Sequence, residues 1–376
     1  MLNKIYYFGV GSLHSDESSV DGGKYIRLPL MIEMMRAGYD VEWIGYERDE
    51  KCVNHFLDLL ELRKENYIID VRKPQVLEKN FVIDSSSKKT QAVKFDEKSI
   101  LFIELRPDED KPGYNFKQEF ETQLKLIDRF HENKMPIFVW DQDVWAYHLP
   151  LEYRKKVVLL RSYFEELDET FPKQELFLYG WFKPSFDSNL SCIADWKRFD
   201  VNYCGNVYGR REEFLEFFKP FHEQNKKVCV QGNWLRKKYD DRDFALDNFP
   251  NFMFFGKTPH WSTLPTIAMS RSVIQFSNEA QQKVGLPTAR IFETLMGKSI
   301  VFCSDKIKHI DRIVPEQLIF STADDLMSKW ERICSDLFRR EDVEIEFERK
   351  LKTPEMSYRH RVVQLGQFVE KYYGHQ

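Results

Sequence analysis

Residues 200–233 read DVNYCGNVYGRREEFLEFFKPFHEQNKKVCVQGN. The apolar run Val201–Cys204 predicts a short buried strand, and Arg211–Glu223 predicts a helix. A second apolar run, Lys227–Gln231, follows the helix and ends at Gly232. Strand, helix and strand in this order, with glycine in the connecting loops, predict a βαβ unit whose strands are parallel.

The same alternation of strands and helices continues on both sides of this unit. Downstream we predict strands at Met253–Phe255, Ser272–Phe276 and Ser299–Cys303, and helices near Ser262–Ser270 and at Thr288–Met296. Upstream we predict strands at Lys4–Gly9, Asp40–Tyr46, Tyr67–Val71, Ser99–Leu105 and Pro136–Trp140, and helices at Tyr25–Ala37 and Phe116–Glu132. The predicted fold class is α/β, with two Rossmann-like domains that face a central cleft.

The two cycles of strands and helices meet around residues 180–198. We predict an N-terminal Rossmann-like domain over residues 1–185 and a C-terminal one over residues 186–355, followed by a terminal helix within residues 356–376 that packs back on the N-terminal domain. A chain of 376 residues is too long for one ordinary core, which agrees with two domains. Ligands of open parallel sheets bind beyond the carboxyl ends of the strands, so functional residues are expected in the loops that follow strands.

Composition and charge exclude several classes of protein. Hydrophobic residues make up 42% and charged residues 31%, which is typical of a globular protein. The net charge of −4 is mild evidence against a polyanionic partner. The six cysteines form no Cys-x-x-Cys pair, which favours reduced thiols over a metal site or disulfides. No signal-peptide pattern and no apolar run of about 20 residues is present, so we expect a cytoplasmic protein without a membrane partner.

The segment Thr288–Thr294, TARIFET, carries the strongest candidate binding residues. Arg290 and Glu293 are three apart and therefore share one face of the predicted helix. A helix N-terminus favours anions, and arginine adds a bidentate donor to phosphate oxygens. The glutamate can accept two hydrogen bonds from ribose hydroxyls. The alternative is an ordinary surface ion pair, which contributes little stability.

The neighbouring strand ends strengthen the interpretation of a nucleotide site. Gly256, Lys257 and Thr258 follow one predicted strand, where backbone groups could meet a flat base edge. Gly205 and Asn206 follow another, and Arg210, Arg211 and Glu212 then open a helix whose N-terminus is a second site of the phosphate-binding type. Together with Gly232 and Gly297, these residues give four glycine-bearing loops around consecutive strands.

In these motifs the chain resembles the phage DNA glucosyltransferases of the β-glucosyltransferase type, which have the GT-B fold. Thr288–Thr294 matches the family's Thr-Leu-Arg-Val-Trp-Glu-Thr, and Phe255–Pro259 matches Thr-Gly-Lys-Ile-Pro. Tyr203–Asn206 with Arg211 matches Tyr-Gly-Gly-Ser and a later arginine, with a one-residue gap. The resemblance implies that Arg290 and Arg211 contact the diphosphate, Glu293 the ribose and the Thr258 backbone the uracil, with Asn206 close to the phosphates.

The predicted catalytic base lies in the N-terminal half, where the run Ile137–Asp141 ends a predicted strand in a carboxylate. An acceptor hydroxyl is a poor nucleophile until a positioned carboxylate takes its proton, and the family carries its catalytic aspartate after a comparable strand. Asp141 is the first candidate, Asp143 the second, and His148 a weaker one. The alternative for Asp141 is an aspartate that caps a helix or loop.

Asp141-Gln142-Asp143 is also an Asp-x-Asp motif, which holds a divalent metal on the donor diphosphate in GT-A glycosyltransferases. A GT-A enzyme uses a single nucleotide-binding domain near its N-terminus and would leave Arg290 and Glu293 without a role. This architecture therefore ranks second, and a metal is possible but not indicated.

The loop before the first helix contains Gly22 and Gly23, which permit close approach of the backbone. In GT-B enzymes this loop faces the donor across the cleft. The family has a glutamate near the position of Lys24, and this departure leaves the sugar open.

The predicted function is transfer of a sugar from a UDP-sugar, with UDP-glucose as the first candidate, to the hydroxyl of a hydroxymethylated pyrimidine in double-stranded phage DNA. Direct displacement by that hydroxyl inverts the anomeric centre, and a phage-encoded enzyme would act in the host cytoplasm. A base in duplex DNA must be flipped out to react, and Trp145 could stack on it. Basic groups such as Arg154–Lys156 with Arg161 are candidate DNA contacts, although ordinary solvated surface is the simpler interpretation of each. Two alternatives remain: a glycan, lipid or small-molecule acceptor, and a non-catalytic nucleotide-binding module.

Overall fold

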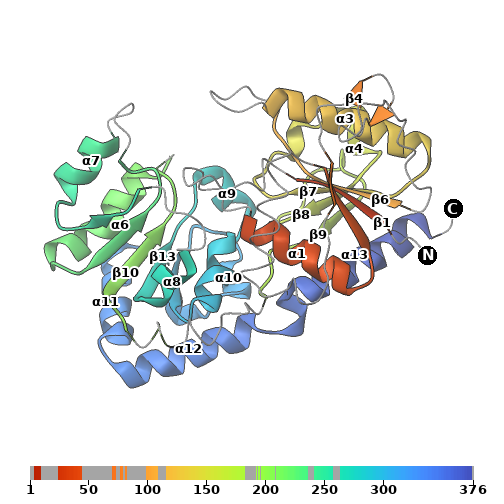
Figure 1. The fold of residues 1–376 in the computed structure, drawn as a ribbon. Helices are drawn as coiled ribbons and strands as arrows, with labels where there is room; N and C mark the ends of the chain where they lie inside the picture. The colour runs from red at the N-terminus through yellow and green to blue at the C-terminus, as the bar shows by residue number, and fades with distance from the viewer. Residues whose placement is uncertain are drawn as a thin grey trace. The chain divides into compact units, whose positions relative to one another are not determined.

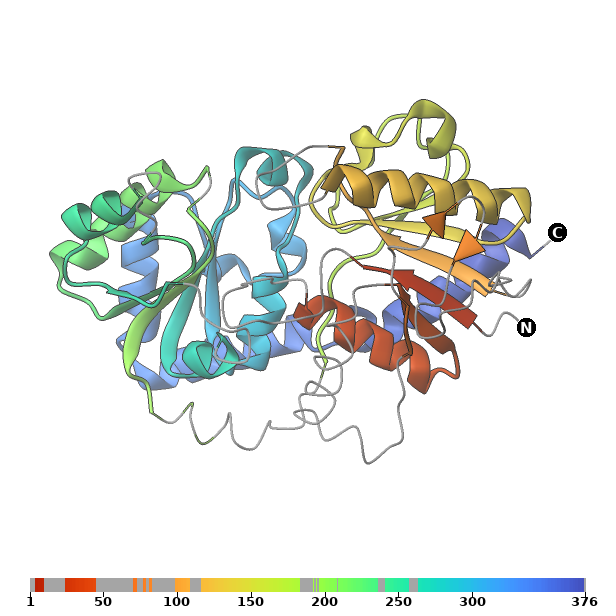
Figure 2. The same ribbon diagram turned by 45° about the horizontal axis from the view of Figure 1, so that its top comes forward.

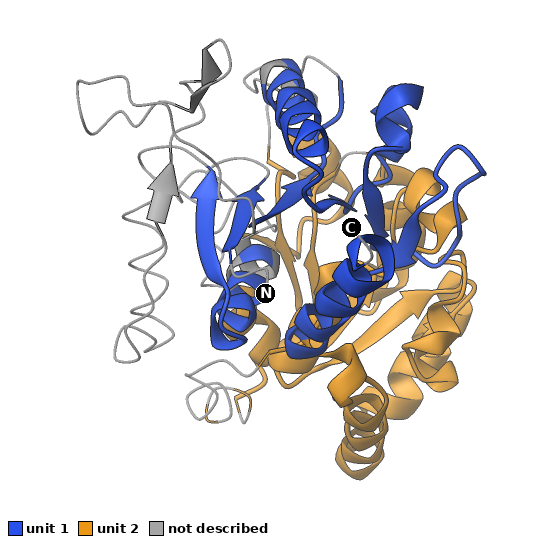
Figure 3. Cartoon of the chain, turned by 90° about the vertical axis from the view of Figure 1, so that its right-hand side faces the viewer, with its two compact units in different colours: residues 1–14, 23–178, 358–376 blue, residues 15–22, 179–357 orange. Residues whose placement is uncertain are grey.

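The computed structural model describes residues 4–9, 24–44, 70–72, 77–78, 81–82, 99–108, 116–182, 192, 194, 196–207, 209–235, 241–256 and 263–374. The chain divides into two compact units (Figure 3). Unit 1 comprises residues 1–14, 23–178 and 358–376, and unit 2 comprises residues 15–22 and 179–357.

Unit 1 is built on a seven-stranded sheet with the strand order β3-β2-β1-β6-β7-β8-β9, in which every neighbouring pair is parallel. The strands are β1 (Lys4–Phe8), β2 (Asp40–Ile44), β3 (Asp70–Arg72), β6 (Ser99–Glu104), β7 (Ile137–Asp141), β8 (Val158–Arg161) and β9 (Gln174–Leu176). Every residue of β6, β7 and β8 is buried, as expected for parallel strands covered on both faces. A separate antiparallel pair is formed by β4 (Leu77–Glu78) and β5 (Phe81–Val82).

Helices cover both faces of the unit 1 sheet (Figures 1 and 2). α3 (Phe116–Glu132) lies on one face, and α1 (Lys24–Arg36) packs with α13 (Tyr358–Tyr373) on the other. The short α4 (Leu151–Arg154) precedes β8. Although α13 is far away in sequence, its Arg361 Nε donates to the Leu178 carbonyl at 2.8 Å. The backbone N–H of Ile137 donates to the Tyr373 hydroxyl at 3.1 Å, so the end of the chain completes unit 1.

Unit 2 is built on a six-stranded parallel sheet with the order β12-β11-β10-β13-β14-β15. Its strands are β10 (Phe199–Cys204), β11 (Val228–Gln231), β12 (Met253–Phe254), β13 (Ser270–Gln275), β14 (Ile300–Ser304) and β15 (Ile319–Phe320). Its helices are α6 (Arg211–Glu223), α7 (Asp241–Asn248), α8 (Thr263–Ala268), α9 (Glu279–Val284), α10 (Ala289–Met296), α11 (Ala323–Cys334) and α12 (Leu337–Leu351). α6 packs with α11, and α10 packs with α8 and α12.

The predicted α/β fold with two Rossmann-like halves is confirmed by these two parallel sheets. None of the described helices is long and apolar enough to cross a membrane.

An aromatic cluster holds the carboxyl end of β10 in unit 2. The Tyr203 ring stacks on Phe276 with centroids 5.0 Å apart, and it meets Phe214 and Trp234 edge to face at 5.2 and 5.8 Å. Trp234 also donates from its indole nitrogen to the Gly205 carbonyl at 2.8 Å. These contacts fix the loop that follows β10 to the loop that follows β11.

Candidate functional site

Three loops at the carboxyl ends of β10, β11 and β12 are hydrogen-bonded to one another. The N–H of Gly205 donates to the Gln231 carbonyl at 3.0 Å, and the N–H of Gly232 donates to the Gly256 carbonyl at 2.7 Å. The N–H of Asn233 donates to the side-chain oxygen of Asn206 at 3.2 Å. Three of the four glycine-bearing loops that stand out in the sequence therefore form one continuous edge of the sheet. The fourth does not belong to it, because Gly297 ends α10 and precedes β14.

Gly232 is required by the close approach of two of these loops. Its φ of +138° is a conformation that side chains rarely adopt. A Cβ at this position would lie 2.1 Å from the Gly205 carbonyl oxygen. Glycine here therefore lets the backbone after β11 lie directly against the backbone after β10.

Arg290 and Glu293 lie on the first turns of α10 and form an ion pair in which Glu293 is buried and Arg290 is largely buried. Their side chains are 14% and 3% exposed, so this is not the solvated surface pair that would be the simpler alternative. Arg290 Nε is buried and has no hydrogen-bond partner among the described residues. A buried guanidinium with a spare N–H can still donate to a ligand that enters.

The ion pair lies beside the end of β10. The Cys204 thiol interacts electrostatically with both Arg290 and Glu293, and it is hydrogen-bonded to Thr263 of α8. Burial raises the pKa of the Cys204 thiol, which therefore stays neutral. Burial also raises the pKa of Glu293, and the Arg290 guanidinium opposes that shift. The pair and the glycine-bearing loops thus share the same edge of the unit 2 sheet.

The two arginines at the start of α6 have different surroundings. Arg211 forms an ion pair with Asp241, and its guanidinium lies 5.3 Å from the centroid of the Phe244 ring. Arg210 instead donates to the Asn206 carbonyl at 3.2 Å and to Gln281 Oε1 at 3.4 Å. Its Nε is buried without a hydrogen-bond partner among the described residues. Arg210 is therefore a candidate phosphate ligand that the sequence motif did not single out.

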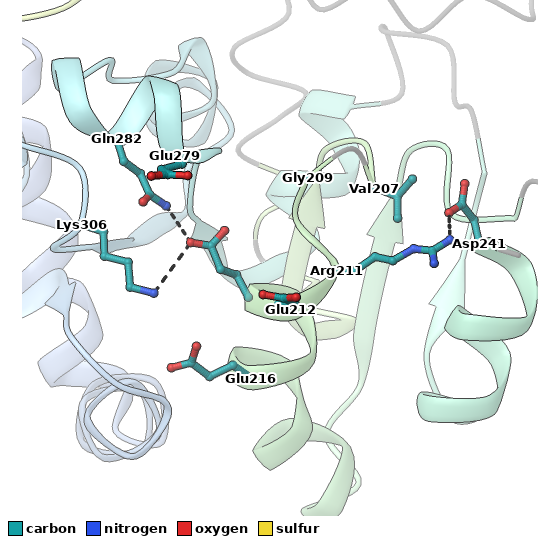
Figure 4. Close-up of a pocket in the computed structure, with 10 residues that line it drawn as sticks. Val207, Gly209, Arg211, Glu212, Glu216, Asp241, Glu279, Gln282 and Lys306 are labelled. Atoms are coloured by element: carbon teal, nitrogen blue, oxygen red, sulfur yellow. Dashed lines mark hydrogen bonds and ion pairs between the residues drawn. The ribbon is translucent and has the colours of Figure 1, made fainter. Parts of the chain in front are cut away.

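Arg211 lines a pocket of about 850 Å³ along the start of α6 (Figure 4). In this pocket Glu213 accepts a hydrogen bond from Gln282 at 2.7 Å and lies 3.8 Å from the Lys306 ammonium. The lining residues are Val207, Gly209, Arg211, Glu212, Glu213, Glu216, Asp241, Glu279, Gln282 and Lys306. Carboxylates outnumber the two cations, and Arg290 and Glu293 are not part of the lining.

Asp141 ends β7 in unit 1, and its carboxylate is completely buried. Oδ1 accepts hydrogen bonds from the N–H groups of Trp145 at 2.8 Å and Asp143 at 3.3 Å. Oδ2 accepts from the Ala146 N–H at 3.0 Å and the Tyr163 hydroxyl at 2.9 Å. Burial raises the pKa of Asp141, and these four donors oppose the shift. The Asp141 carboxylate thus caps the N–H groups of the loop that follows it, which is the alternative role considered from the sequence. A substrate hydroxyl must displace one of the four donors to reach the carboxylate.

Asp143 lies two residues further on and is exposed. His148 ends the short 3₁₀ helix Ala146–His148. Among the described residues, no group of three or more histidine, cysteine, aspartate or glutamate side chains is arranged to hold a metal ion. Four further predicted site residues, Lys257, Thr258, Gly22 and Gly23, lie outside the described residues.

Three of the basic groups near β8, Arg154, Lys156 and Arg161, bond to other groups of the protein, and Arg161 is buried. Arg161 is 3% exposed and donates to the carbonyls of residues 163, 164 and 165, so it is not part of a surface patch as the sequence suggested. Arg154 donates to two carbonyls and to Thr170, and Lys156 bonds to Asp128 at 2.6 Å.

Several solved structures share the fold of this chain along nearly its whole length. No protein-family model matches the chain, and no curated protein matches it in sequence. Among solved structures, T4 phage BGT in complex with UDP and Mn²⁺ matches with a TM-score of 0.60 and 12% identity, over 98% of this chain and 99% of that one. The protein has the GT-B fold.

Two further solved structures support this assignment. The DNA-modifying enzyme β-glucosyltransferase, studied with and without uridine diphosphoglucose, matches with a TM-score of 0.59 and 12% identity, over 98% of this chain and 99% of that one. The Anabaena protein HepE in complex with UDP-glucose matches with a TM-score of 0.57 and 10% identity, again over 98% and 99%. The resemblance inferred from the motifs is thus matched by similarity of fold along nearly the whole chain.

Proposed function

We propose that this GT-B protein is a glycosyltransferase that uses a UDP-sugar as donor. The observation that carries the proposal is the buried Arg290–Glu293 pair at the end of β10, beside loops whose backbones are hydrogen-bonded to one another. A buried ion pair is weak evidence for stability, because desolvation offsets much of its attraction. The Arg290–Glu293 pair keeps an N–H of Arg290 without a partner among the described residues, next to a strand end. This arrangement is better explained by binding of a ligand than by a contribution to stability.

In this proposal each part of the edge has a distinct role in holding the donor. Arg290 donates to the diphosphate, and Glu293 accepts from the ribose hydroxyls. Arg210 is a second cation beside Asn206, whereas Arg211 must leave Asp241 to reach a phosphate. Thr258 would meet uracil through its backbone. The donor sugar proposed first is glucose, which the T4 and Anabaena neighbours' UDP-glucose complexes support.

Asp141 is the proposed base, with Asp143 as the second candidate. Asp141 takes the proton of the acceptor hydroxyl while the oxygen forms a bond to the anomeric carbon of the sugar. The bond from that carbon to the diphosphate breaks, UDP leaves with the electron pair, and the anomeric centre is inverted. The raised pKa of the buried Asp141 suits this role, because a base is most effective when its pKa lies nearer the working pH. The longest of its hydrogen bonds, from the Asp143 N–H at 3.3 Å, is the one a substrate would replace most easily.

The acceptor we propose is the hydroxyl of a hydroxymethylated pyrimidine in DNA. Support comes from the full-length similarity to a DNA-modifying β-glucosyltransferase. The second candidate is a glycan, lipid or small-molecule acceptor. It is favoured by the net charge of −4 and by the hydrogen bonds that Arg154, Lys156 and Arg161 make to other groups of the protein. A protein that binds DNA mainly through phosphates would carry free cations instead.

One assay separates these possibilities. The protein is incubated with a panel of UDP-sugars and with DNA that contains hydroxymethylcytosine or hydroxymethyluracil, and the nucleosides are analysed by mass spectrometry. A mass increase of one hexose supports the DNA acceptor. Hydrolysis of the UDP-sugar without modification of the DNA would contradict a DNA acceptor and favour a glycan, lipid or small-molecule acceptor. Failure to bind any UDP-sugar in calorimetry would leave a non-catalytic protein and overturn the proposal.

A further inference from the structure

Tyr163 connects a neighbouring strand to the proposed base. It follows β8 by two residues, is fully buried, and donates its hydroxyl to Asp141 Oδ2 at 2.9 Å. Because β7 and β8 are paired in parallel with Asp141 opposite Arg161, the contact joins the ends of adjacent strands. A side-chain donor from another strand can restrain the rotation of the carboxylate independently of the loop to which it belongs.

The segment that carries Tyr163 is itself held in place. The Arg161 guanidinium donates to the carbonyls of residues 163, 164 and 165, which wraps this segment around a buried cation. A buried cation with several carbonyl partners is costly to move, since each carbonyl would lose a charge-assisted bond. Tyr163 is therefore a firm partner for Asp141.

The loop on the other side of the carboxylate is conformationally unusual. Val144 has a φ of +65°, in the left-handed region that β-branched residues rarely occupy. This turn directs the N–H groups of Asp143, Trp145 and Ala146 toward the carboxylate. The backbone thus surrounds Asp141 on one side, and Tyr163 approaches it from β8.

The charged and titratable groups that flank Asp141, along the chain or across the sheet, come from three elements. On the β8 side they are Tyr163 and Arg161, and in the loop after β7 they are Asp143, Tyr147 and His148. At the end of the neighbouring β6, Glu104 is bound to Arg27 Nε at 2.5 Å and to the Tyr7 hydroxyl at 2.6 Å. Glu104 is therefore balanced by its own cation. Among the described residues, Tyr163 is the neighbour that bonds directly to the Asp141 carboxylate through its side chain.

We propose that Tyr163 is a positioning residue for the base, holding the Asp141 carboxylate in one orientation and setting how readily it takes a proton. The proposal rests on Asp141 being the base of the proposed transfer. A donor to an ionised carboxylate favours the charged form, so its removal raises the proton affinity. Tyr163 would therefore keep Asp141 ionised, and able to act as a base, at a lower pH than burial alone would allow.

The test compares Tyr163→Phe with Tyr153→Phe. Tyr153 donates its hydroxyl to Asp128 at 2.7 Å in the same unit, so the control also removes a tyrosine–aspartate hydrogen bond but leaves Asp141 untouched. In Y163F the acid limb of kcat/KM against pH should move up by roughly one pH unit, since a hydrogen bond to a charged group changes an equilibrium about tenfold or more. In Y153F the limb should stay in place. An unmoved limb in Y163F overturns the proposal.

A second readout does not depend on catalysis. The Asp141 carboxyl ¹³C resonance is titrated by NMR in the wild-type protein and in Y163F, and its midpoint should rise in the variant. If the midpoint rises but the wild-type protein transfers no sugar, the proposed function and with it the role of Tyr163 in catalysis fail, and only the effect of Tyr163 on the proton affinity of Asp141 stands. If transfer occurs and neither the midpoint nor the acid limb moves, the role of Tyr163 fails. Should Y163F not fold, the wild-type Tyr163 Cζ resonance must respond as Asp141 is protonated, and a flat signal overturns the contact.

Discussion

At the scale of single residues, Arg290 and Glu293 show how burial changes the meaning of a common pattern. The spacing of three on a helix is shared by Glu33 and Arg36, whose pair is partly exposed. Exposed pairs of this kind contribute about 0–1 kcal/mol. The pair on α10 is enclosed at a strand end beside Cys204, where its members can still bond to a ligand. The burial of this pair cannot be predicted from the sequence, and it favours a role in nucleotide binding over that of a surface ion pair.

We expect Arg290→Ala to weaken UDP binding about 10- to 100-fold, because it removes charge-assisted hydrogen bonds to the diphosphate. Isothermal titration calorimetry measures the effect directly. Lys283→Ala is the matched control, since Lys283 forms an exposed pair with Glu279 on the neighbouring α9. Its UDP affinity should equal that of the wild type. Equal affinities for R290A and K283A would show that the pocket has been assigned to the wrong residues.

Different effects on stability are expected for substitutions of Asp141, which ends β7, and of Asp143, which lies in the loop after it. Asp141→Asn should abolish sugar transfer and lower the melting temperature, because an amide cannot accept from all the donors around the Asp141 carboxylate. Asp143→Asn should leave both largely intact, since Asp143 is exposed. Both variants should keep wild-type UDP affinity.

Differential scanning fluorimetry and a transfer assay on the same samples distinguish the two aspartates. Full activity in D141N would exclude Asp141 as the base. Loss of activity in a fully stable D143N would move the role to Asp143.

At the scale of elements, the strands that carry the donor loops were predictable from sequence, and β8 was not. β10, β11 and β13 are apolar runs with glycine or polar residues at their ends, which is a strong local signal. β8 is a strand of only four residues that closely follows Arg154–Lys156. In the sequence, the charged residues before it are typical of a surface patch and give no sign of a buried strand. The contact between Tyr163 and Asp141 spans 22 residues and depends on the pairing of β7 with β8. No periodicity in one sequence can reveal such a contact.

The start of α6 illustrates the same limit. The sequence predicts the helix and places two adjacent arginines at its N-terminus, of which Arg211 fits the family motif. Adjacent residues at a helix start point about 100° apart, so their surroundings are decided by the neighbouring elements. Here α7 supplies Asp241 to Arg211, whereas α9 supplies Gln281 to Arg210.

The contact between the β10 and β11 loops can be tested with glycine substitutions. Gly232→Ala should lower the free energy of unfolding by about 2–3 kcal/mol, because its Cβ would overlap the Gly205 carbonyl oxygen. Gly209 also has a positive φ, of +60°, but open space where a Cβ would lie, so for Gly209→Ala we expect a loss of only about 1 kcal/mol. UDP affinity should fall in G232A and be retained in G209A. Equal effects of the two substitutions in urea unfolding would mean that backbone strain, and not the close approach of the loops, makes glycine necessary.

At the scale of the whole molecule, the chain leaves unit 1 after β9 and returns to it at α13, after all of unit 2. α13 packs on α1, bonds to Leu178 through Arg361, and reaches β7 through Tyr373. Removal of residues 358–376 should therefore destabilise unit 1, which contains Asp141. Unit 2 keeps its sheet and the Arg290–Glu293 pair, because none of its strands is removed.

We expect the truncated protein to bind UDP within about twofold of the wild-type affinity and to transfer no sugar, because only the unit that contains the proposed base is disturbed. Calorimetry measures the first quantity and nucleoside mass spectrometry the second. Deletion of residues 375–376 alone is the control and should change neither. Hydrogen exchange should show loss of protection in β6 and β7 with protection retained in β10 and β13. If UDP binding is lost and β10 also loses its protection from hydrogen exchange, the two units do not fold independently. Undiminished sugar transfer would exclude unit 1 as the source of the base.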